Sequence, residues 1–128
     1  MTPEAADHLR KETACLERAR TILAADVPDV AAREAYLAAF HAAQALILDR
    51  TGREAKTHRG VHVQFARLTR HEPLLTDELR RFLPRSYDMK SLADYSIGPD
   101  ADVPVEQAAT VVEAGERFVA CVAALLGP

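Results

Sequence analysis

A short basic segment in the middle of the chain carries the side chains best suited to chemistry. Arg53, Lys56, Thr57, His58 and Arg59 fall within seven residues. Histidine titrates near neutral pH and arginine makes bidentate contacts to phosphate, so the segment is a candidate anion site. Thr57 can cap a helix, and the backbone N–H groups at a helix start favour anions. Alternatively, Thr57 and His58 only begin a helix, and His58 holds the preceding loop by a hydrogen bond.

A second group of polar side chains follows further along the chain and comprises Arg85, Lys90, Asp94 and Tyr95. Lys90 and Asp94 are four residues apart, which is the spacing of an ion pair on one helical face. One interpretation is structural: this pair and the Tyr95 hydroxyl lock a helix against the rest of the fold. The other interpretation is that all four side chains line one cleft together with the basic segment.

Metal and thiol chemistry have little support in the sequence. His58 and His62 are four residues apart, which suits two metal ligands, but only His41 is available as a third. We therefore expect no metal, and we expect His41 to be a packed or partly exposed histidine. Cys15 and Cys121 match no zinc or redox motif, which predicts two buried free thiols. No pattern involves the remaining histidines, His8 and His71.

The charge of the chain is unevenly distributed. The formal net charge is −3, which does not predict a nucleic-acid-binding protein. Residues 50–90 nevertheless hold ten Lys or Arg and five acids, whereas the two flanks together hold six Lys or Arg and fourteen acids. A basic middle suits a surface that binds phosphate. Alternatively, these charges are spread over separate solvated helix faces.

The apolar spacing predicts an all-α fold, an up-and-down bundle of about five helices in a single domain of residues 1–128. The expected helices cover residues 4–25, 29–52, 58–71, 76–95 and 104–126, with the fourth divided at Pro84 and a loop over 96–104. Thr2, Asp29 and Thr57 are the expected N-caps, and Gly52 ends the second helix.

Side-chain size predicts which helix is central. The segment between Asp29 and Gly52 is rich in alanine, so neighbouring backbones can approach it closely. Tyr36 is expected in its core face. In the first helix, Leu9, Leu16 and Leu23 repeat every seven residues, which predicts one buried stripe. Nothing resembles a signal peptide and no apolar run approaches the ~20 residues of a membrane span, so we expect a cytoplasmic location.

Three motifs occur in order along the chain. The central helix carries A-Y-x-A-x-F-x-A-x-x-A-L from Ala35 to Leu46, the basic segment begins K-T-H-x-G-V-x-x-x-F at Lys56, and A-D-Y ends at Tyr95. In this order and spacing they resemble the HEPN domains (higher eukaryotes and prokaryotes nucleotide-binding), particularly the small prokaryotic stand-alone branch. The resemblance implies a helical bundle that binds nucleotide or RNA without a cofactor, forms a homodimer and has a nucleotidyltransferase partner, commonly as a toxin–antitoxin component.

The resemblance has one departure that bears on catalysis. Many HEPN domains are metal-independent endoribonucleases with an Arg-(four to six residues)-His motif just before the last helix. Here that region, Arg85 to Tyr95, contains no His, and Lys90 stands where relatives commonly carry Arg. Only Arg53 and His58 have the motif's spacing, in a different connection. Because RNA cleavage needs a proton acceptor and a cation, a ribonuclease that uses His58 is the alternative to a binding module. A purely structural dimerisation module is the third possibility.

Overall fold

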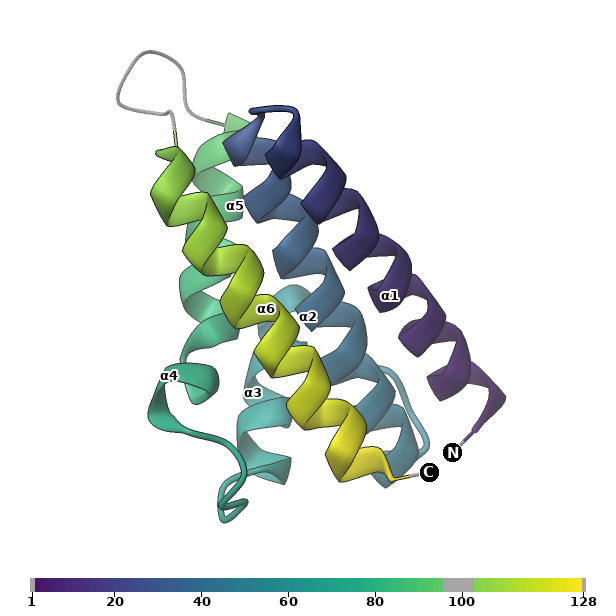
Figure 1. Ribbon diagram of the computed structural model, residues 1–128. Coiled ribbons are helices and arrows are strands. Elements are labelled where there is room, and N and C mark those ends of the chain that lie inside the picture. Colours follow the sequence, from purple (N-terminus) through teal and green to yellow (C-terminus); the bar gives the residue numbers. More distant parts are fainter. Residues whose placement is uncertain (1, 96–102, 128) are drawn as a thin grey trace.

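The protein is a bundle of α-helices, as the sequence predicts. The computed structural model describes residues 2–95 and 103–127, with the backbone alone described over residues 90–95 (Figure 1). No strand occurs in these ranges, and the helices are α1 (Pro3–Ala24), α2 (Pro28–Thr51), α3 (His58–Leu68), α4 (Asp77–Arg80), α5 (Phe82–Tyr95) and α6 (Val105–Leu126). The expected fourth helix is divided into α4 and α5 at Arg81, and Pro84 lies in the first turn of α5, where proline is tolerated.

The central position of α2 is confirmed. It packs against α1, α3, α5 and α6, and most of its residues are buried. The helices α2 and α6 are in direct contact at Gly115, where an added Cβ would lie 3.5 Å from the Cβ of Ala35 and 3.4 Å from the ring of Phe82. Figure 1 shows α1, α2 and α6 as the long helices, with the start of α1 and the end of α6 at the same end of the bundle.

The boundaries of α2 differ from the prediction at one end. Gly52 ends the helix as expected, with a φ of 77° that suits glycine. Asp29 is not the N-cap, however. Val27 holds that position without a side-chain bond, Pro28 is the first helical residue, and Asp29 lies in the first turn. The fixed φ of proline suits the first position, and an acid in the first turn complements the helix dipole.

The buried face of α1 also differs from the prediction. Its buried residues are Ala5, His8, Glu12, Cys15 and Ala19. The heptad leucines are only half-buried and lie beside this line. Small side chains fit the line because α1 lies close to the alanine face of α2. The same buried line also carries two ionisable side chains, His8 and Glu12.

The remaining helices follow the prediction with small shifts. Thr2 and Thr57 cap α1 and α3 as expected. The third helix ends at Leu68, short of the predicted residue 71, and the hydroxyl of Thr69 donates to the carbonyl of Phe65 at 2.7 Å. Both cysteines are free, although Cys121 is half-buried rather than buried. Among the described helices, none has the length and apolar character that a membrane crossing requires.

Candidate functional site

The connection between α2 and α3 brings the basic segment to the surface. Arg53, Lys56, Thr57 and Arg59 are all exposed. The hydroxyl of Thr57 accepts a hydrogen bond from the backbone N–H of Gly60 at 2.8 Å, which fixes the start of α3. These four predicted site residues are therefore exposed on the connection and the first turn of α3.

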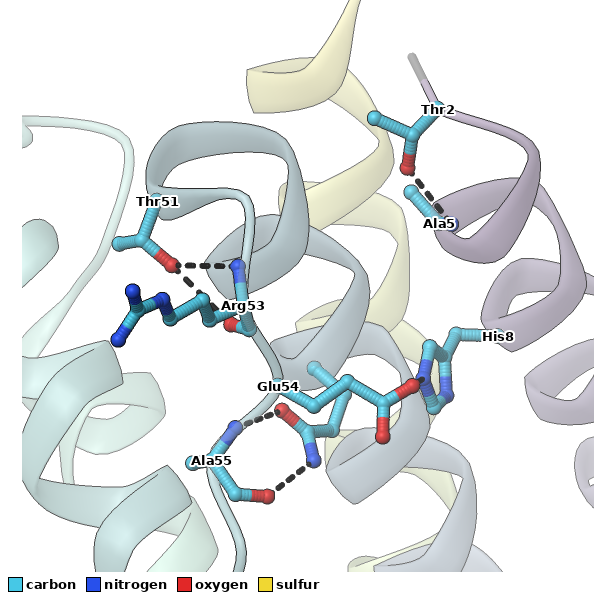
Figure 2. Close-up of polar contacts among 8 residues, drawn as sticks. Thr2, Ala5, His8, Thr51, Arg53, Glu54 and Ala55 are labelled. Atoms are coloured by element: carbon cyan, nitrogen blue, oxygen red, sulfur yellow. Dashed lines mark hydrogen bonds and ion pairs between the residues drawn. The ribbon is translucent and has the colours of Figure 1, made fainter.

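The backbone of this connection is held by neutral hydrogen bonds, most of which Figure 2 shows. Gln44 of α2 donates to the carbonyl of Ala55 at 2.8 Å and accepts from its N–H at 3.1 Å. The hydroxyl of Thr51 accepts from the N–H of Arg53 at 3.2 Å, and its one hydrogen lies within reach of the carbonyls of Ile47 and Arg53, at 2.8 and 3.1 Å. The backbone on both sides of Glu54 is thus fixed from α2. Gln44, which is 4 % exposed in the alanine face, was missed as a positioning residue.

A buried imidazole reaches the same connection from α1. Nε2 of His8 lies 2.9 Å from a carboxylate oxygen of Glu54 (Figure 2). The His8 ring stacks on that of His41, with centroids 5.7 Å apart. Burial, and next His8 and Lys11, lower the pKa of His41 to about 4. Sequence reasoning gave no role to His8, because its partners are distant in the chain.

His58 points into the bundle rather than toward the exposed cations. Its Nδ1 lies 2.7 Å from the hydroxyl of Tyr36, on α2. Its ring packs against Phe40 and Tyr87, with centroid distances of 4.6 and 5.0 Å. The ring is half-buried, and the hydrogen bond and both ring contacts fix its orientation. Tyr36 was expected in the core, and its buried hydroxyl required a polar partner that the sequence alone did not identify.

His62 completes this cluster one turn further along α3. Its Nε2 lies 2.9 Å from the same Tyr36 hydroxyl. A hydroxyl has one hydrogen, so Tyr36 donates to one imidazole while the other imidazole donates to it. Burial, followed by the neighbouring His58, lowers the pKa of His62, while Asp88 opposes this shift. Burial raises the pKa of Tyr36, which keeps the hydroxyl protonated.

The pairing of these histidines does not form a metal site. His58 and His62, which have the spacing of metal ligands, both direct a ring nitrogen at Tyr36. In the part of the chain that the structure describes, no three His, Cys, Asp or Glu side chains converge in a way that could hold a metal ion.

The second predicted group does not join the basic segment through Arg85. Arg85 lines a cavity between α5 and α6, whereas Tyr87, two residues later, contacts the histidines from the other side of α5. The expectation of one common cleft is thus wrong for Arg85. The backbones of Lys90, Asp94 and Tyr95 continue α5, and their side chains lie outside the described part of the structure.

Two comparisons identify similar proteins. A family model described as "HEPN domain" matches residues 5–125. A protein of Archaeoglobus fulgidus named "UPF0332 protein" is 36% identical over 85 residues, which cover 66% of this chain and 65% of that relative. The alignment thus spans slightly less than two thirds of the relative's length.

Proposed function

Because the chain belongs to the HEPN domain family, we propose that it binds the phosphate groups of RNA or a nucleotide at the start of α3. One observation carries the proposal. Arg53, Lys56 and Arg59 are exposed together, and no ion pair joins them to an acid within the described residues. By contrast, four other cations are paired with acids, in Arg10–Asp7, Arg18–Glu34, Arg20–Glu116 and Arg117–Glu78.

Two features of the local fold support phosphate binding. The N-terminus of α3 adds the positive end of a helix dipole to the three cations. The bonds from Gln44 and Thr51 hold the connection before any ligand arrives. A preformed site loses less conformational entropy on binding than a loop that must be ordered.

The test is a titration of the whole chain with short fluorescein-labelled single-stranded RNA, and with a labelled nucleotide, over a series of salt concentrations. Three phosphate contacts should give a slope of log K against log salt of about −2 for single strands. The combined variant Arg53→Gln, Lys56→Gln, Arg59→Gln should lose most of this slope and bind weakly even at low salt.

A control with the same change in charge separates a local site from general attraction. Lys11, Arg70 and Arg81 are exposed and lie outside this segment. Replacing all three by Gln should leave most of the affinity and the slope in place. An equal loss in both triple variants, or no binding of RNA or nucleotide by the unaltered chain, would refute the proposed site.

A metal-independent endoribonuclease is the alternative function. It is favoured by the bond between Tyr36 and Nδ1 of His58, because a general base works best when a further group fixes its orientation. Purified protein with a chelator present would then cleave RNA, and His58→Ala would abolish cleavage. RNA that binds and stays intact over a long incubation would leave the binding function alone.

We further propose that the chain acts with a second protein. Its family membership favours a nucleotidyltransferase partner and a homodimer. Affinity purification of the tagged chain from its own cells, followed by mass spectrometry, tests the partner, and sedimentation over a range of concentrations tests the dimer. Recovery of the chain without a nucleotidyltransferase would remove the first proposal, and a concentration-independent monomer would remove the second.

A further inference from the structure

A cavity of about 310 Å³ opens between α5 and α6, beside α4. Its apolar lining includes Phe82, Met89, Val111 and Ala114. Small-molecule sites have volumes of roughly 300–1,000 Å³, so this cavity is large enough for a small ligand. It lies on the opposite side of α5 from Tyr87, and therefore away from the histidine cluster.

One uncompensated charge lies at this cavity. Arg85 lines it, is exposed, and forms no ion pair among the described side chains. Glu78 also lines it, but its two carboxylate oxygens accept hydrogen bonds from Arg117 at 2.8 and 3.2 Å. Gln107 and Thr110 supply neutral polar groups on the α6 side. An apolar surface with one available cation complements a ligand that has an apolar body and one negative charge.

We propose that this cavity is a binding site for a small amphipathic anion, such as a medium-chain carboxylate. The apolar body lies against Phe82 and Met89, and the anionic group binds Arg85. Burial of the body supplies affinity, while the charge-assisted hydrogen bond from Arg85 selects an anion over a neutral analogue. The flexible thioether of Met89 allows the lining of the cavity to adapt to ligands with apolar groups of different shapes. The site is separate from the proposed phosphate site at α3.

The experiment uses the intact chain and the fluorescent probe anilinonaphthalene sulfonate, which combines an aromatic body with one sulfonate. The probe should bind with a stoichiometry of one and with enhanced fluorescence. Arg85→Gln should weaken binding about tenfold, the effect of losing one hydrogen bond to a charged group. Thr110→Trp should abolish binding, because the larger side chain fills the cavity that Thr110 lines. The fold should tolerate this change, since Thr110 is exposed and its hydroxyl donates to the carbonyl of Glu106 in its own helix.

Arg81→Gln is the matched control. Arg81 is exposed one turn before Arg85, does not line the cavity, and its replacement changes the net charge equally. It should leave probe binding unchanged. Equal weakening by Arg81→Gln and Arg85→Gln would show general electrostatic attraction and overturn the proposal. Circular dichroism and thermal unfolding confirm that each variant is folded, because a partly unfolded chain also binds this probe.

Competition tests the chemical class of the ligand. Octanoate should displace the probe, whereas octanol, with the same apolar body and no charge, should displace it about tenfold less well. Equal displacement by both, or undiminished probe binding to Thr110→Trp, would refute an anion site in this cavity. Neither result depends on whether RNA binds at α3, so the two proposals can fail independently.

Discussion

A single buried hydroxyl organises the best-defined polar cluster of the protein. Tyr36 is fully buried and lies within hydrogen-bonding distance of both His58 and His62. It therefore joins the first turns of α3 to the core face of α2. The aromatic rings of Phe40 and Tyr87 enclose the same atoms. The cluster thus fixes the orientation of α3, and with it the cations that precede the helix.

Tyr36→Phe tests the contribution of this hydroxyl. The variant keeps the ring and its packing but leaves Nδ1 of His58 and Nε2 of His62 without this partner. The loss should lower the free energy of unfolding by about 1–3 kcal/mol, the cost of leaving buried polar groups unsatisfied. Urea denaturation measures the effect. An unchanged midpoint and slope would mean that water or other groups already replace the hydroxyl.

The start of α3 illustrates how neighbouring residues in an element constrain each other. An added Cβ at Gly60 would lie 2.9 Å from Oγ1 of Thr57, which is too close. The same oxygen accepts the N–H of Gly60 as the cap of the helix. Glycine is thus required here by the cap and not by its own backbone conformation.

A double-mutant cycle separates these two effects. Thr57→Ala should cost about 1 kcal/mol through loss of the cap. Gly60→Ala alone should also destabilise, because the new methyl group displaces the hydroxyl. In the Thr57→Ala background the obstacle is gone, so Gly60→Ala should instead stabilise by roughly 0.5–1 kcal/mol, since alanine is the better helix former. Additive effects in thermal or urea unfolding would disprove this coupling.

The α1–α2 interface encloses ionisable groups and so should respond to pH. The pKa of His41 is lowered from 6.5 to about 4, chiefly by burial. The unfolded chain therefore binds a proton at a higher pH than the folded chain does. Stability should fall as the pH drops from about 6.5 toward about 4. Burial raises the pKa of Glu12, which gives the opposite slope in its own range.

Comparison with His41→Leu isolates the histidine, because Glu12 is present in both proteins. The free energy of unfolding of the variant should rise relative to the parent as the pH falls from 7 to 4. The variant also removes a buried Nδ1 that has no hydrogen-bond partner in the described structure. The measurement is urea denaturation at several pH values. A constant difference between the two proteins would contradict the lowered pKa.

At the scale of the whole molecule, α2 is the element on which the other helices pack. The close approach of α6 at Gly115 leaves little room for a larger residue. Gly115→Leu should therefore destabilise by about 1–3 kcal/mol through overpacking, while Gly115→Ala should be much milder because an added Cβ would lie at ordinary van der Waals distance from its neighbours. Calorimetry compares the two variants. Equal melting temperatures would show that α6 can move away from α2 without cost.

The architecture was predictable because it depends on local patterns. Apolar periodicity located the long helices, and the alanines identified α2 as central. Pro84 indicated that the fourth helix is interrupted, although the break lies earlier, at Arg81. It was harder to predict which residues of each helix face the core, because the buried line of α1 is set by the alanine face of α2 rather than by the leucines of α1. The family could also be inferred from three short motifs.

The candidate site was only partly predictable for a related reason. Arg53, Lys56, Thr57 and Arg59 are adjacent in sequence, so their proximity at the surface followed directly. The contacts of Tyr36 with His62, and of His8 with Glu54, join residues far apart in the chain. Such pairings depend on the register and rotation of packed helices, which a single sequence read by itself does not reveal.

The reciprocal hydrogen bonds between Gln44 and Ala55 constrain the number of residues that can lie between them. They tie together two positions eleven residues apart, one in a rigid helix and one in the chain that leaves it. An inserted residue within α2 after Gln44 would rotate the end of the helix by about 100° and misdirect the exit. An insertion after Gly52 would instead push Ala55 out of reach. The length of the intervening segment should therefore tolerate neither insertions nor deletions.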